Sequence, residues 1–166
     1  MVCRISPGLC HNLSSILHIA QPTFDLKKVM TTKRITKVFL GLMGLAFCKV
    51  GIEALLAPQS VLQNVGIELE NPSAFSSMRA VYGGMHFAFG AFCFWGVFKN
   101  LKSPLTLLML YTTGFVIGRS VSVWMDGAPN EFVNTWFITE FFSLIISGTL
   151  YYFLHKQERE THAIAL

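Results

Sequence analysis

Charged residues are scarce in this chain. Lys, Arg, Asp and Glu make up 13% of its 166 residues, whereas about a quarter of the residues in a typical soluble domain are charged. Hydrophobic residues make up 52%, and phenylalanine alone occurs 15 times. A soluble protein of this length has too small an interior to bury so much apolar surface. The composition therefore excludes an ordinary soluble domain and indicates a lipid bilayer as the partner.

The sequence also lacks the spacings that hold metals and cofactors. Its four cysteines, Cys3, Cys10, Cys48 and Cys93, form no CxxC pair, and no histidine stands at zinc-ligand spacing. Haem would need a second histidine at the depth of His86, but the other four histidines lie in the terminal segments. We therefore expect no metal and no cofactor.

Four apolar stretches are long enough to cross a bilayer, at residues 36–57, 78–98, 104–125 and 135–154. Each is close to the roughly 20 residues that a helix needs to span a hydrocarbon core of about 30 Å. Only helices and closed barrels satisfy the backbone in lipid, and these stretches are too long and too few for a barrel. The sequence predicts an all-α fold, a bundle of four transmembrane helices within residues 35–155.

The flanking segments differ from this membrane domain. Residues 1–34 contain an apolar run at 9–20 that polar residues interrupt, which is unlike a signal peptide. We predict a loosely ordered extension or a misplaced start, because Met30 followed by TTKRITK is typical of a bacterial start. Residues 156–166 are predicted to form a charged cytoplasmic tail.

Basic residues indicate the orientation. All of them except Lys49, Arg79 and Arg119 lie in the N-terminal segment, the 99–102 turn or the C-terminal tail, while the other two connections carry acidic residues. By the positive-inside rule both termini are cytoplasmic, as in a multi-pass protein of a bacterial inner membrane. The basic residues flank membrane segments and form no reading face, so we expect no nucleic-acid partner.

Ionisable residues occur inside all four apolar stretches, although each costs a few kcal/mol in hydrocarbon and therefore marks a site or an ion pair. From the rise of 1.5 Å per residue, Arg119 and Glu140 both lie about 7 Å from mid-span, toward the outer face, and His86 lies near the midplane. We predict an Arg119–Glu140 contact, a Lys49–Glu53 pair and a polar pocket open to the outer side. The alternative is that these pairs only hold the helices together. The predicted ligand-binding residues are Glu53, Arg79, Tyr82, His86, Arg119, Ser122, Asp126 and Glu140.

Small residues predict close packing between helices, because lipid offers no hydrophobic drive for helix association. Gly114 and Gly118 form a GxxxG pair, for which we favour packing within the chain over a homo-oligomer, and Gly84 lies between Ala80 and Ala88 in a similar row. Ser143 and Ser147 form another on the last stretch. A structural role is predicted for Gly83, Gly84, Gly114, Gly118, Gly127 and Pro129.

Four sequence elements carry a resemblance: GIEALLAP, MRAVYGGMHFAFG, GRSVSVWMDGAP and FITEFF. Together they resemble the bacterial family catalogued as domain of unknown function 4345, over about residues 35–155. The resemblance implies a small four-helix inner-membrane protein, and it implies no activity. Matched to the RAxYGG and GRxxSxxxDGxP elements and to the acidic positions, it points to Glu53, Arg79, Tyr82, Gly83, Gly84, Arg119, Ser122, Asp126, Gly127, Pro129 and Glu140.

Three functions fit this sequence. The first is a non-enzymatic membrane protein whose outer pocket binds a small amphiphile, a lipid or a quinone, or docks a membrane partner. The second is an enzyme acting on a lipid or isoprenoid-like substrate, with Glu140 or Asp126 as general acid/base and His86 exchanging a proton. The third is a small transporter. The sequence has no nucleophile–base pair and no metal motif, so binding is preferred to catalysis.

Overall fold

A computed structural model of the chain describes residues 26–164, and this part is helical with no strand. Its elements in chain order are α2 (Leu26–Leu56), α3 (Pro58–Gln63), α4 (Pro72–Met78), the π-helix η1 (Arg79–Met85), α5 (His86–Phe98), α6 (Lys102–Asp126) and α7 (Glu131–Ile164). The predictions for residues 1–25 lie outside the described residues.

Four of the described helical stretches are long and apolar enough to cross a membrane, at Lys27–Leu56, Pro72–Phe98, Lys102–Asp126 and Glu131–Ala163. The predicted all-α fold with four membrane spans is confirmed, and the chain is a multi-pass membrane protein. The helices extend beyond the predicted spans. Helix α2 starts within the predicted extension, and α7 continues through most of the predicted tail.

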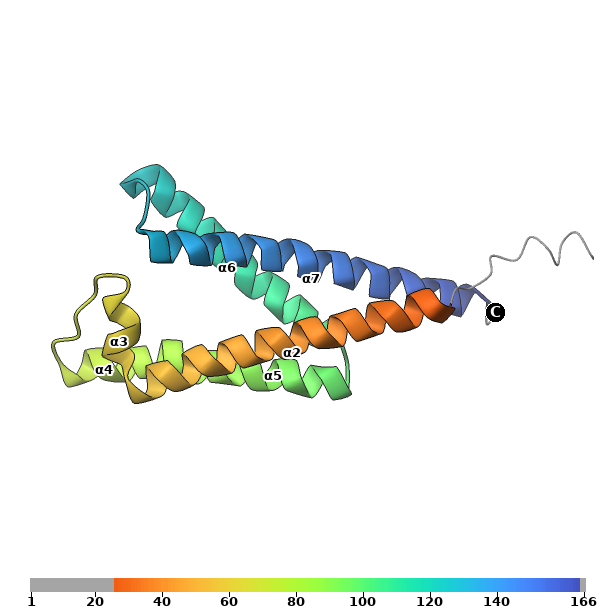
Figure 1. The fold of residues 1–166 in the computed structure, drawn as a ribbon, viewed down its shortest axis with the longest axis horizontal. Coiled ribbons are helices and arrows are strands. Elements are labelled where there is room, and N and C mark those ends of the chain that lie inside the picture. Colours follow the sequence, from red (N-terminus) through yellow and green to blue (C-terminus); the bar gives the residue numbers. More distant parts are fainter. Residues whose placement is uncertain (1–25, 165–166) are drawn as a thin grey trace, which may run out of the picture.

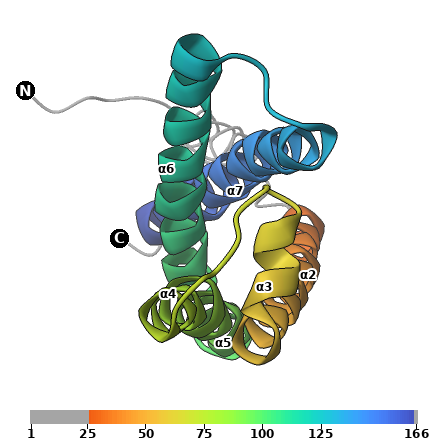
Figure 2. The same ribbon diagram turned by 90° about the vertical axis from the view of Figure 1, so that its left-hand side faces the viewer.

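The four long helices form two antiparallel pairs. Helix α2 packs along η1 and α5, and α6 packs along α7. Viewed along the bundle, the order around the ring is α2, α5, α6, α7 (Figure 2). We call the end where α2 begins and α7 ends the terminal end, and the opposite end, with α3 and the 127–130 turn, the loop end (Figure 1). The pairs diverge toward the loop end (Figure 1).

Buried contacts join the two pairs at the terminal end. Thr36 on α2 has no exposed surface, and the Gln157 side-chain amide donates to the Thr32 hydroxyl at 3.0 Å. Within the second pair, Lys102 at the start of α6 also forms an ion pair with Glu158 on α7. An apolar core that includes Leu40, Leu105 and Leu154 lies beside these contacts. The two helix pairs are therefore held together at the terminal end and separate toward the loop end.

Glycines bring α2 against α5 at backbone distance. A Cβ atom added at Gly90 would lie 2.5 Å from the Cys48 Sγ and 2.8 Å from the Gly44 carbonyl oxygen, and one added at Gly51 would lie 2.7 Å from the Phe87 nitrogen. Gly83 similarly faces Leu55. Gly44 and Gly51 lie seven residues apart on α2, two turns of helix, so both stay on the contact face.

Two predicted packing rows are wrong. A Cβ atom at Gly114 or Gly118 would meet nothing within 4 Å, and at Gly84 it would meet only its own helix. The four-residue spacing is present, but these residues lie on faces that no other described helix covers. A Cβ atom added at Gly83, by contrast, would lie 2.7 Å from the Leu55 side chain, and Ser147, in the serine row of α7, has no exposed surface.

The turn between α6 and α7 follows from two residues. Gly127 ends α6 with a φ of +93°, which L-residues with a side chain rarely adopt. Asn130 caps α7, because its side-chain oxygen accepts from the Val133 N–H at 2.9 Å. Pro129 lies between them, half-buried.

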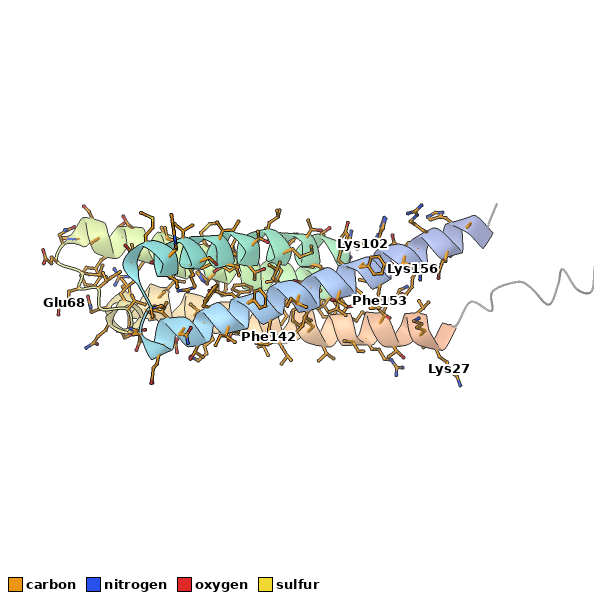
Figure 3. The ribbon with its side chains drawn as sticks, turned by 90° about the horizontal axis from the view of Figure 1, so that it is seen from above. Lys27, Glu68, Lys102, Phe142, Phe153 and Lys156 are labelled. Carbon is orange, nitrogen blue, oxygen red and sulfur yellow. The ribbon has the colours of Figure 1, made fainter. Side chains whose placement is uncertain are left out.

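The outer surface is apolar along the helices and charged at the ends. Phe142 and Phe153 point outward from α7, Lys27 and Lys156 lie toward the terminal end, and Glu68 lies at the loop end (Figure 3). Large exposed apolar side chains run along every long helix, such as Val38, Leu110 and Phe142 at 63%, 69% and 58%. Such a belt is what a helix bundle presents to lipid.

Candidate functional site

A cavity of about 530 Å³ lies between the two helix pairs. Residues of α2, α3, η1, α5, α6 and α7 line it. It occupies the space that opens where the pairs diverge, and α3 with the turn after it contributes its wall at the loop end. Five of the eight predicted ligand-binding residues line it: Glu53, Tyr82, His86, Arg119 and Glu140.

An ion pair joins α6 to α7 in the cavity wall. The Arg119 Nε donates to Glu140 Oε2 at 2.7 Å, and Nη2 donates to Oε1 at 3.1 Å, so the contact is bidentate. Only 24% of the Arg119 side chain and 11% of the Glu140 side chain are exposed. The Phe115 ring lies beside the guanidinium, 5.8 Å from its carbon. The predicted Arg119–Glu140 contact is confirmed, and the charges of the two side chains cancel inside the bundle.

A hydrogen bond between His86 and Tyr111 crosses from α5 to α6. The Tyr111 hydroxyl lies 2.8 Å from His86 Nε2, and the Val81 carbonyl oxygen lies 3.4 Å from Nδ1. Because a carbonyl oxygen only accepts, we assign the ring proton to Nδ1, which leaves Nε2 to accept from the tyrosine. His86 is 9% exposed, and the Tyr82 ring stacks on it at a centroid distance of 5.7 Å. The imidazole is satisfied in its neutral form.

The π-helix η1 positions Tyr82 and His86. In a π-helix the backbone bonds run from residue i to i+5, so each turn holds an extra residue and the face that follows is rotated by about 100°. His86 is the first residue of α5 after this segment. Sequence reasoning missed the π-helix, and a regular helix would have placed Arg79 on the face of Tyr82 and His86. In the structure the Arg79 Nε instead donates to the Leu55 carbonyl oxygen at the end of α2, at 3.0 Å.

Three predicted site residues lie away from the cavity. Arg79 caps α2 beside the Phe75 ring. The Ser122 hydroxyl donates to Asp126 Oδ2 at 3.0 Å, within the exposed last turns of α6. None of these three side chains lines the cavity, so Asp126 does not share in balancing the charge of Arg119.

A second ion pair lies on α2. The Lys49 Nζ donates to Glu53 Oε1 at 2.8 Å, as predicted, and the two side chains are 72% and 49% exposed. Both residues line the cavity. Such an exposed i, i+4 pair stabilises a helix by about 0.5 kcal/mol or less, so its structural role is small.

Sequence reasoning missed Tyr111 and most of the aromatic wall. Tyr111, Phe115 and Arg119 follow one another at four-residue intervals on α6 and all line the cavity, a spacing that keeps them on one face. That spacing could have found them. Phe132 and Trp136 add aromatic rings from α7. Their position beside the cavity depends on how the two pairs diverge, which periodicity does not report.

A hydrogen bond spans the loop end. The Asn130 side-chain nitrogen, just before α7, donates to the Asn64 carbonyl oxygen at the end of α3, at 3.0 Å. Asn64 itself lines the cavity. Among residues 26–164, no group of three His, Cys, Asp or Glu side chains is placed to hold a metal ion. The chemistry that the described cavity offers is therefore hydrogen bonding, ion pairing and ring stacking.

Comparison with known proteins gives one match. A sequence model described as "Domain of unknown function (DUF4345)" matches residues 35–151. No curated protein and no solved structure matches the chain. The matched segment contains the apolar helices Pro72–Phe98 and Lys102–Asp126, the larger part of the other two, and the Arg119–Glu140 and Lys49–Glu53 ion pairs. The chain belongs to the DUF4345 family of unknown function.

Proposed function

We propose that this protein binds a small membrane amphiphile, a lipid or a quinone, in the cavity between its helix pairs. The observation that carries the proposal is a cavity of about 530 Å³ whose wall combines polar side chains with apolar and aromatic ones. Binding sites for small molecules have this character, with a few placed polar groups among apolar and aromatic side chains.

The lining separates into two kinds of surface. Arg119, Glu140, His86 and Tyr111 supply polar atoms that would contact a headgroup. Apolar side chains from α2, α3, α6 and α7 also line the cavity and would contact a tail. An amphiphile matches both parts, whereas a fully polar solute would leave the apolar wall without a partner.

We further propose that the protein lies in a bacterial inner membrane with its terminal end in the cytoplasm. Basic side chains at the terminal end and acidic ones at the loop end support this orientation. The cavity would then open toward the outer leaflet.

The test is co-purification from membranes with matched variants. Ala46 lines the cavity and Ala88 is exposed on α5 away from it, so Ala46→Phe adds a phenyl ring to the cavity wall while Ala88→Phe adds the same side chain to the lipid face. Each full-length protein is extracted in mild detergent, and its bound lipids and quinones are quantified by mass spectrometry. We expect a stoichiometric amphiphile with the wild type and Ala88→Phe, and a loss of about tenfold with Ala46→Phe, since a phenyl ring at position 46 takes space in the cavity. Equal amounts in all three proteins would refute binding in this cavity.

One observation favours a second function, an enzyme acting on a lipid or isoprenoid-like substrate. The same cavity reaches both His86 and Glu140. Both carboxylate oxygens of Glu140 already accept from Arg119, however, and His86 accepts from Tyr111. Acid/base chemistry would require these bonds to open, whereas binding requires no change, so binding is the better-supported function. If the purified protein chemically converts the co-purified amphiphile, the enzymatic function becomes the better-supported one.

A further inference from the structure

We propose that the headgroup bound in this cavity is an uncharged planar ring that presents carbonyl oxygens, as in a quinone, and is not an anionic lipid headgroup. This inference rests on the proposed binding function and narrows its ligand class. Three properties of the cavity support it: its balanced charge, its unused donors and its aromatic wall.

The formal charges that line the cavity cancel in pairs. Lys49 is paired with Glu53, and Arg119 is paired with Glu140 through both carboxylate oxygens. His86 is satisfied as a neutral ring between Val81 and Tyr111. An anionic headgroup next to Arg119 would also lie beside Glu140, and repulsion between the like charges is strong where water is scarce. The site has no unpaired cation to offset a phosphate.

Hydrogen-bond donors are nevertheless left over. A guanidinium carries five N–H groups, and the contact with Glu140 uses two of them, which leaves three for a ligand. No described residue accepts from Arg119 Nη1 or pairs with the Tyr82 hydroxyl, and both side chains line the cavity. They come from opposite helix pairs, on α6 and η1. The cavity therefore offers free hydrogen-bond donors while its net charge is balanced, and such a site matches a ligand with uncharged carbonyl oxygens.

Aromatic rings make up much of the remaining wall. Tyr82 and His86 lie in parallel planes, and Phe115, Phe132 and Trp136 line the cavity from α6 and α7. Planar rings stack favourably on aromatic side chains, which a branched glycerol headgroup does not do. The wall therefore favours a flat ring over a diacylglycerol, which is also uncharged.

The test uses the fluorescence of Trp136, which quinones quench. In the full-length protein, Trp95→Phe and Trp124→Phe leave Trp136 as the reporter in the cavity. A matched variant with Trp95→Phe and Trp136→Phe retains Trp124, which is 86% exposed and lines no part of the cavity. Decyl-benzoquinone is titrated into each protein in detergent. Dioctanoyl phosphatidylglycerol and dioctanoylglycerol are then added as competitors.

We expect saturable quenching of Trp136 and a linear, collisional response from Trp124. Tyr82→Phe should weaken the quinone about three- to tenfold, the effect of one neutral hydrogen bond, while the fold is kept. Neither lipid should reverse the quenching at about tenfold the quinone concentration.

If phosphatidylglycerol displaces the bound quinone at a concentration equal to that of the quinone, the proposal that the headgroup is uncharged is overturned. If dioctanoylglycerol does so, the proposal that the headgroup is a planar ring is overturned. Both results leave amphiphile binding intact. Absence of saturable quenching, in a protein that still co-purifies an amphiphile sensitive to Ala46→Phe, overturns the inference alone. If co-purification also fails, the proposed function falls with it.

Discussion

Breaking the Arg119–Glu140 pair should destabilise the bundle more than removing it altogether. In Arg119→Met the Glu140 carboxylate, 11% exposed in the wild type, loses both of its guanidinium donors. An uncompensated buried charge costs about 3–5 kcal/mol, and the 24% exposure of Arg119 favours the lower part of that range. We therefore expect about 3 kcal/mol from Arg119→Met and a similar cost from Glu140→Met. The double variant should cost about 1 kcal/mol, because apolar side chains can replace a buried pair at little cost.

The free energy of unfolding is measured by titrating the protein in mixed micelles with a denaturing detergent, with helicity as the readout. Lys49→Met and Glu53→Met provide the matched control, since this pair is exposed and each change should cost less than about 1 kcal/mol. Single changes at Arg119 and Glu140 that cost under about 1 kcal/mol and simply add in the double variant would refute the reasoning.

The same double variant separates structure from binding. It should stay folded while lacking the guanidinium donors and the carboxylate acceptors in the cavity wall. If it loses the co-purified amphiphile, the pair takes part in binding. If it keeps the full amount, the pair only joins α6 to α7.

Four further predictions test other parts of the molecule. Gly90→Ala should cost about 1–3 kcal/mol, because its Cβ would lie 2.5–2.8 Å from atoms of α2. Gly114→Ala, with nothing within 4 Å, should stabilise α6 by about 0.5–1 kcal/mol in the same unfolding assay; the opposite order would contradict the packing described. Tyr111→Phe should cost about 1–3 kcal/mol, since it leaves the buried His86 Nε2 without its donor, and a change below about 0.5 kcal/mol would show that water replaces it. In a cysteine-free background, a cysteine at Glu68 should react with a membrane-impermeant maleimide in intact cells, whereas one in the last turn of α7 should react only after lysis. The reverse pattern would overturn the proposed orientation.

Local rules explain which features could be predicted. The spans follow from hydropathy and length, which do not depend on neighbouring helices. The Arg119–Glu140 contact was predictable because both charges fall at the same depth, and a charge at that depth needs a partner. The confirmed Lys49–Glu53 pair required only helical periodicity.

Features that depend on phase were harder to predict. Arg79 was expected at the pocket and instead caps α2, because η1 adds a residue per turn between it and α5. Gly114 and Gly118 were expected to pack within the chain, but spacing alone does not show which face meets a neighbour. Tyr111 lines the cavity and was overlooked, although its spacing from Arg119 places both on one face.

The sequence by itself determined that this protein is a bundle of four membrane helices with its charges paired at a common depth, because burial in lipid is decided segment by segment. Only the tertiary structure decided that α2 and α5 close tightly on glycines while α6 and α7 diverge from them. The cavity exists because of that divergence, and its lining comes from six elements. Contacts between elements far apart in the chain, and the phase shift at η1, set this arrangement, and neither is encoded in the periodicity of any single helix.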